Sequence, residues 1–270
     1  MSKNFYFENP IEKTLEKKEE KEQNIEKLKS FIEKISSNLN QEKIPVNKEG
    51  RINLDAFDKI YPKSTIEKDK TIAKELEQQK WYKGLSEAEI EKEKPKRTGE
   101  QLEMLKTAIL YKNLHKDFIV ARASSYDDIN GVDNVILEKD TGNTICALDE
   151  VSEISGEIFR KKEKNVLDKN REGGGKLKYG IKLEEGEISI GEVKNLPLFY
   201  LALPQKYVEK GMEELIPSLE ENSEYGKNIF NWFVSSIDSQ IKSLKLEPNL
   251  NKELYKRILC FEKTIQKFKN

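Results

Sequence analysis

The sequence predicts a mixed α/β fold in which a central core of helix, three strands, helix and strand (αβββαβ, with a mixed sheet) is extended at both ends by helices. Residues 117–152 contain three short β-rich segments in succession, at 118–123, 132–137 and 144–151. The sequence on either side is charged and carries apolar residues at helical spacing. Of 270 residues, 36% are charged and 36% are hydrophobic, which favours one compact centre with polar helical flanks.

This pattern divides the chain into three regions. Residues 1–96 form a charged helical region, residues 97–205 form the α/β core, and residues 206–270 form helices expected to pack on the core or on the N-terminal helix. Residues 1–10 are expected to be a loose tail. Helices are expected at 11–39 and 64–83 before the core, and at 206–221, 225–245 and 251–269 after it.

Two of these helices carry apolar seams that need a partner. The seams consist of Ile25, Leu28, Ile32 and Ile35 near the N-terminus, and of Leu254, Ile258, Phe261, Ile265 and Phe268 near the C-terminus. The first seam can be covered by the C-terminal helices of the same chain or by a second copy. Because the two seams are alike, one expectation is that the two ends of the chain pack together, and another is a homodimer through the seams.

Within the core, helix 98–114 precedes the strands, and its buried stripe is Leu102, Leu105 and Ile109. The turn at 139–143 has hairpin chemistry, which makes the second and third strands antiparallel neighbours. Helix 154–170 ends before three glycines, and a hairpin follows at 177–193 with its turn at 184–187. The segment 198–203 is apolar throughout, as expected of a strand covered on both faces.

Composition excludes several classes of protein. The two cysteines have no partners at metal-ligand spacing, and the chain contains no apolar run long enough for a signal peptide or a membrane span. We therefore expect a cytoplasmic protein without a membrane partner. No region has a strong basic excess, so contacts with nucleic acid would come from local patches such as 92–97 or 160–164.

Acidic residues stand at the ends of two neighbouring strands. Asp133 begins the second strand, and Asp149 and Glu150 lie near the end of the third. Paired strands would bring these carboxylates together, and their repulsion raises their pKa values unless a cation binds between them. Mg²⁺ or Mn²⁺ held there would stabilise charge on phosphoryl oxygens and deprotonate a water. Adjacent strand residues point to opposite faces, so only one of Asp149 and Glu150 shares the cleft with Asp133.

The order of elements, together with the segments 118–124, 132–133 and 146–151, resembles the PD-(D/E)XK nuclease superfamily, which includes archaeal Holliday-junction resolvases and restriction endonucleases. The resemblance covers residues 98–203. It implies a restriction-endonuclease-like fold and Mg²⁺-dependent hydrolysis of phosphodiester bonds, in DNA more than in RNA. It also implies metal ligands among Asp133, Asp149 or Glu150, and Glu100 (or Glu103). The motif favours Glu150 over Asp149, because the position that follows the acidic ligand is usually apolar.

The sequence departs from this family at the motif lysine, which orients or activates the attacking water. Ser152, or Val151 in the other alignment, stands in its place. The resemblance then implies a lysine from another element, for which the candidates are Lys161, Lys162, Lys176 and Lys178, with Lys161 and Lys178 assigned to catalysis. Phosphate contacts are expected from Arg122, Arg160 and Lys162.

A hypothesis from a different class is a catalytically inactive scaffold or helical interaction module. The missing lysine and the two seams support it. Structural roles also compete at single positions: Asp127 and Asp128 as turn caps, Asp133 as a turn residue beside Gly131, Asp149 and Glu150 as a solvated strand exit, and Trp81, Trp232 and Phe233 as core.

Overall fold

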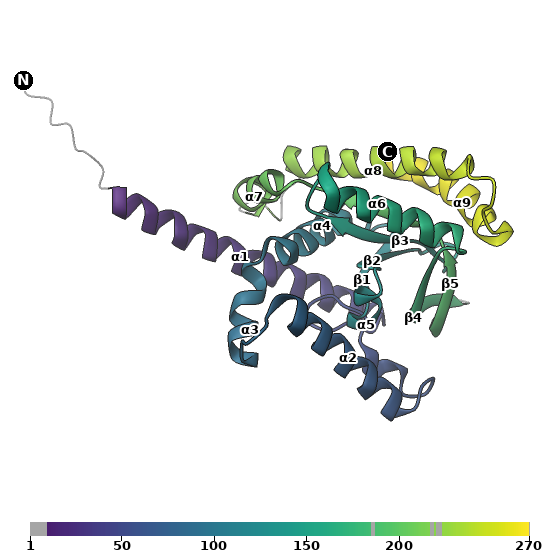
Figure 1. Ribbon diagram of the computed structural model, residues 1–270, viewed down its shortest axis with the longest axis horizontal. Coiled ribbons are helices and arrows are strands. Elements are labelled where there is room, and N and C mark those ends of the chain that lie inside the picture. Colours follow the sequence, from purple (N-terminus) through teal and green to yellow (C-terminus); the bar gives the residue numbers. More distant parts are fainter. Residues whose placement is uncertain (1–9, 185–186, 217–218, 220–222, 270) are drawn as a thin grey trace, which may run out of the picture.

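The computed structural model describes residues 10–184, 187–216, 219 and 223–269, and it has the mixed α/β architecture that the sequence predicts (Figure 1). The predicted tail at 1–10 falls, except for Pro10, outside these residues. The helices before the sheet are α1 (Pro10–Gln41), η1 (Leu54–Phe57), α2 (Lys63–Trp81), α3 (Glu87–Glu93), η2 (Lys94–Lys96) and α4 (Thr98–Leu114). Those within and after it are α5 (Ser125–Ile129), α6 (Gly156–Arg171), α7 (Gln205–Glu214), α8 (Glu224–Lys245), α9 (Lys252–Thr264) and η4 (Ile265–Lys269).

A four-stranded mixed sheet forms the centre, in the order β1 (Phe118–Arg122), β2 (Asn134–Glu138), β3 (Thr144–Val151) and β6 (Leu198–Ala202). The first three strands are antiparallel neighbours, and β6 pairs with β3 in parallel. Asn134 lies opposite Leu148, so the residue before β2 is next to the end of β3. Helices α6 and α8 both pack on β6, which confirms the prediction of a strand covered on both faces.

The predicted second hairpin is present as β4 (Gly175–Glu184) and β5 (Glu187–Leu196), which pair as a separate two-stranded sheet. Its expected turn includes residues 185–186, which lie outside the described part of the chain. Helix α7 ends at Glu214, short of the predicted residue 221. Pro217 accounts for the early end, since proline has no N–H donor and disfavours helical backbone in the residue before it. Residues 217–218 and 220–222 of that expected helix are also outside the described residues.

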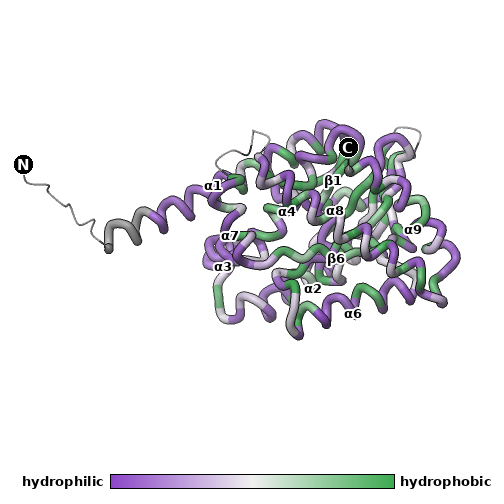
Figure 2. The backbone as a smooth tube through the Cα atoms, turned by 90° about the horizontal axis from the view of Figure 1, so that it is seen from above, coloured by the Kyte–Doolittle hydropathy of each residue, from purple (hydrophilic) through white to green (hydrophobic). Residues whose placement is uncertain are grey.

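The three sequence regions share one hydrophobic core, which includes side chains from Ile25 to Phe268. Apolar residues concentrate in the body of the molecule around β6, while the part of α1 that projects from the body is mostly hydrophilic (Figure 2). Both seams are buried within the chain: the first in α1, which packs on α4, and the second in α9 and η4, which pack on α8. The prediction that a seam serves a second copy is therefore wrong for these side chains.

Candidate active site at the ends of β2 and β3

A cleft of about 1350 Å³ lies where the second and third strands meet the helices. Its walls come from α2, the start of α4, α5, the end of β3 and α6. Several residues that the sequence singles out line it together, including Glu100, Asp133, Asp149, Glu150 and Lys162. They lie between residues 100 and 162 of the chain, on different helices and strands, and the fold brings them to one cleft.

The carboxylates of Asp133 and Asp149 converge on one backbone group. Asp133 Oδ2 accepts a hydrogen bond from the Glu150 N–H at 2.6 Å, and Asp149 Oδ1 accepts from the same N–H at 2.9 Å. Burial, reinforced by the negative charge of Asp149, raises the pKa of Asp133 well above its usual value. Asp133 thus faces the cleft beside a second carboxylate, not bulk solvent as a simple turn residue would.

Gly131 makes this approach possible. Its φ is +80°, a conformation that side chains with a Cβ rarely adopt. A Cβ at this position would lie 3.6 Å from Asp149 Oδ2 and would collide with the amino group of Lys169. The turn that leads into Asp133 therefore depends on glycine for its backbone conformation, whereas a Cβ there would displace only the end of the Lys169 side chain.

Asp149 and Glu150 point in opposite directions, as strand geometry predicts. Asp149 Oδ1 lies 2.5 Å from Nζ of Lys162 on α6, whereas Glu150 forms an ion pair with Lys106 on α4. Asp149 is therefore the residue that pairs with Asp133, and the preference of the sequence motif for Glu150 is not what the geometry favours. The Glu150 carboxylate is engaged by a cation of its own.

Lys106 is a residue of the site that the sequence patterns did not indicate. This lysine is fully buried, and burial lowers its pKa to about 8 against the opposing charges of Asp133 and Glu103. A local signal existed, since Lys106 lies four residues after Leu102 and therefore on the buried side of the predicted helix. A charged residue in that place needs a buried partner, which is Glu150.

Two buried arginines organise the acidic residues of α4. Arg122 Nη2 lies 2.9 Å from Glu100 Oε1 and also contacts Glu103. Arg51 Nη2 lies 2.7 Å from Glu103 Oε2, and its Nη1 lies 2.5 Å from Asp128 Oδ2. Burial alone would raise the pKa of Glu103, but Arg51 and Arg122 lower it to about 2. These ion pairs occupy Glu100, Glu103 and Asp128, so the expected metal role of Glu100 has an arginine competing for it.

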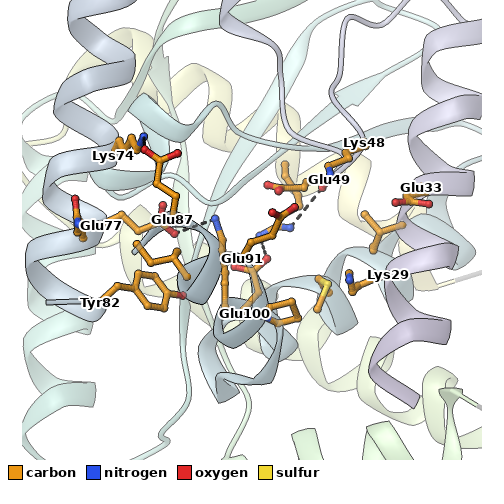
Figure 3. A pocket seen from close by; sticks show the side chains of 17 residues that line it. Lys29, Glu33, Lys48, Glu49, Lys74, Glu77, Tyr82, Glu87, Glu91 and Glu100 are labelled. Carbon is orange, nitrogen blue, oxygen red and sulfur yellow. Dashed lines mark hydrogen bonds and ion pairs between the residues drawn. The ribbon is translucent and has the colours of Figure 1, made fainter. Parts of the chain in front are cut away.

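The expected phosphate contact by Arg122 does not fit its environment. Arg122 is 1% exposed and lines a second hollow of about 420 Å³ between α1, α2, α3 and α4. Figure 3 shows this hollow, which is lined by both acidic and basic side chains, with Lys74 paired to Glu87 at one side of it. Arg122 thus braces α4 against β1 instead of facing the cleft.

The other predicted basic residues lie outside the cleft. Arg160, Lys161 and Lys176 are exposed on the surface. Lys178 forms an ion pair with Asp69 on α2 and lies near three tyrosine rings. The structure therefore does not bring Lys161 or Lys178 to the carboxylates. Lys161 points about 100° away from its neighbour Lys162 around α6. Lys178 lies on β4, which belongs to a separate sheet.

Asp127 has a structural role, as one of the two alternatives predicted. Its carboxylate accepts hydrogen bonds from the N–H groups of Lys178 at 2.8 Å and Tyr179 at 3.2 Å, and from the Ser124 hydroxyl at 2.7 Å. It therefore ties α5 to β4. The core roles predicted for the tryptophans are wrong: Trp81 is 50% exposed and Trp232 is 39% exposed, while Phe233 is buried as expected.

Asp133 and Asp149 are the residues of the cleft that could hold a divalent cation. Within the described residues, no group of three or more His, Cys, Asp or Glu side chains forms a cage for a metal. Mg²⁺, however, usually keeps several waters and takes one or two protein carboxylates together with substrate phosphates. Asp133 and Asp149, which share one N–H donor, are two such carboxylates, and the Lys162 amino group already pairs with Asp149 as a cation of the protein itself.

Comparison with protein-family models, curated proteins and solved structures returned no significant match for this chain. Among the described residues, no helix combines the length and apolar character needed to cross a bilayer.

Proposed function

We propose that this protein is a divalent-metal-dependent nuclease that hydrolyses phosphodiester bonds of DNA or RNA in the cleft at the ends of β2 and β3. The observation that carries the proposal is the convergence of Asp133 and Asp149 on the Glu150 N–H. Two carboxylates brought this close in a lined cleft favour a cation between them.

The order and pairing of the core elements support the proposal. Helix α4, the antiparallel strands β1 to β3, helix α6 and the parallel strand β6 follow the sequence of elements that the resemblance to PD-(D/E)XK nucleases implies. The two acidic positions stand at the corresponding ends of β2 and β3. A restriction-endonuclease-like core is the fold that we infer from this agreement.

Asp133 and Asp149 are the residues that would hold the cation. A bound Mg²⁺ or Mn²⁺ would neutralise charge on the phosphoryl group and lower the pKa of a bound water. The protein itself contributes a fixed pair of ligands, because the Glu150 N–H orients both carboxylates. Glu150 in turn is held by Lys106 on the opposite side of β3.

Lys162 is the residue that we assign to the role of the missing motif lysine. Its Nζ lies 2.5 Å from Asp149 Oδ1 and lines the cleft. The charges of Asp149 and Asp133 outweigh the effect of burial and raise its pKa, so the amino group stays protonated. A permanent cation here would orient a phosphate oxygen or the attacking water. It would not act as a general base.

Thermal melting with and without Mg²⁺ or Mn²⁺ tests the metal site. A cation at about 100 times its Kd stabilises a protein by about 2.7 kcal/mol, which corresponds to a rise in Tm of about 5–10 °C for a chain of this size. We expect this rise in the wild type and in Asp140→Asn, a control at an exposed carboxylate in the β2–β3 turn. Asp133→Asn should show no rise. An unchanged Tm of the wild type in both metals would refute the site.

Cleavage of labelled DNA and RNA tests the chemistry. Lys162→Met should abolish cleavage, whereas Lys161→Met, a change at the exposed neighbouring lysine, should preserve it. Binding of metal without cleavage of either polymer would overturn the nuclease proposal and favour a catalytically inactive nuclease-fold scaffold.

A further inference from the structure

The cleft carries an unusual share of the exposed apolar side chains. In the described part of the chain, nine large hydrophobic side chains are exposed. Four of them line this one cleft: Leu76 and Trp81 on α2, Ile129 on α5 and Ile158 on α6. A metal site for small phosphate esters has no need of such residues, so they point to a larger ligand with apolar surfaces of its own.

Trp81 stands among cations that no acidic side chain neutralises. The Lys80 amino group lies 4.5 Å from the centre of the Trp81 ring, and the Arg97 guanidinium carbon lies 4.1 Å from it. Arg97 donates a hydrogen bond to the Tyr82 hydroxyl. Within the described residues, neither Lys80 nor Arg97 has a carboxylate at ion-pair distance. Both belong to the cleft lining, and both are available to a negatively charged ligand.

The opposite wall of the cleft also supplies positive charge. Lys162 and Lys169 project from α6, and Lys169 donates to the backbone carbonyl of Asn130, not to a carboxylate. Cations from α2, the start of α4 and α6 line the same cleft as a half-exposed aromatic ring and three further exposed apolar side chains. This combination complements a chain of phosphates that carries flat bases.

We propose that the cleft binds single-stranded nucleic acid, with one base stacked on Trp81 and the flanking phosphates held by Lys80 and Arg97. The proposal rests on the nuclease function inferred above and names its substrate class. A base reaches the ring by displacing the Lys80 side chain, which no described carboxylate holds in place. The displaced amino group then lies beside the backbone of the bound strand. A duplex keeps its base faces within the stack, so it offers Trp81 no partner.

Binding is measured in EDTA, where a metal-dependent enzyme does not cleave its ligand. The probes are a fluorescein-labelled single strand of DNA, the RNA strand of the same sequence, and the blunt DNA duplex. The chain has two tryptophans, so Trp232→Phe leaves Trp81 as the sole intrinsic reporter. Trp232 lies on α8 against Tyr207, outside the cleft lining, and serves as the matched control.

We expect single strands to quench Trp81 fluorescence and to bind more tightly than the duplex. Trp81→Ala should weaken binding of single strands between about 5-fold and 150-fold, as loss of one stacked base does, while Trp232→Phe binds like the wild type. Lys80→Gln should reduce the slope of log affinity against log salt by about 0.7. Circular dichroism of Trp81→Ala checks that the fold is intact.

The outcomes separate this proposal from the nuclease function. Equal or tighter binding of the duplex, or unchanged binding by Trp81→Ala, overturns the single-strand site even if Mg²⁺-dependent cleavage is observed. Binding of single strands that depends on Trp81 supports the site. If such binding is found without cleavage of any probe in Mg²⁺, the nuclease function fails and the binding site remains. Absence of both binding and cleavage overturns both proposals.

Discussion

Removal of the buried cation of Lys106 is the sharpest test of the electrostatics around the site. In Lys106→Met the Glu150 carboxylate, whose side chain is 6% exposed, loses the amino group that neutralises it. Breaking a buried ion pair by removing one partner typically costs about 3–5 kcal/mol, because the remaining charge stays desolvated. For a chain of this size that loss corresponds to a fall in Tm of about 6–20 °C.

Urea unfolding followed by circular dichroism measures this loss, with Lys164→Met as the control. Lys164 is also a lysine with an acidic partner, but its side chain is 75% exposed, so its removal should cost less than about 1 kcal/mol. The double change Lys106→Met and Glu150→Leu replaces the pair with apolar groups of similar size. It should recover most of the stability, since a well-packed apolar pair substitutes for a buried ion pair at little or no cost.

The wild type, Lys106→Met, Glu150→Leu and the double variant together form a double-mutant cycle. This cycle gives the coupling free energy between Lys106 and Glu150, which should exceed about 1 kcal/mol for groups in direct contact. A Lys106→Met variant within about 1 kcal/mol of the wild type would refute the buried pair, and so would a double variant whose loss equals the sum of the two single losses.

Two further predictions concern the arginines beside the cleft. The pKa of Glu103 falls from 4.5 to about 2 in the folded protein, so its contribution of about 3 kcal/mol is complete above pH 4.5 and is lost as the pH falls toward 2. Urea unfolding of the wild type and Glu103→Gln should therefore give free energies of unfolding that converge in acid, and parallel pH curves would contradict this pairing. Arg51→Met should cost about 3–5 kcal/mol, because the side chain is 7% exposed and bridges two carboxylates. Arg171→Met removes an ion pair whose arginine is 47% exposed and should cost less than about 1 kcal/mol, so equal losses in the two variants would show that burial does not set the cost.

The roles of Arg122 and Lys162 are set by partners that are distant in sequence. Arg122 ends an apolar strand and carries the positive charge expected of a phosphate contact, but Glu100 and Glu103 on α4 bind it within the protein. Lys161 and Lys162 are neighbouring lysines, and nothing in the sequence shows which of them faces the carboxylates. Only the rotation of α6 against β3 decides that Lys162 meets Asp149.

The sequence by itself determined the longer helices and the strands of both sheets, the apolar faces of α1, α4 and α9, and the presence of acidic residues at the ends of β2 and β3. These features follow from periods of 2 and 3.6 residues, which are properties of short segments. The sequence did not indicate the short helices η1, η2 and α5. The tertiary structure alone decided that Asp149 joins Asp133, that Lys106 neutralises Glu150, and that both apolar seams close on the chain itself. Such outcomes depend on strand register, helix rotation and competition between partners far apart in the chain, and no local pattern encodes them.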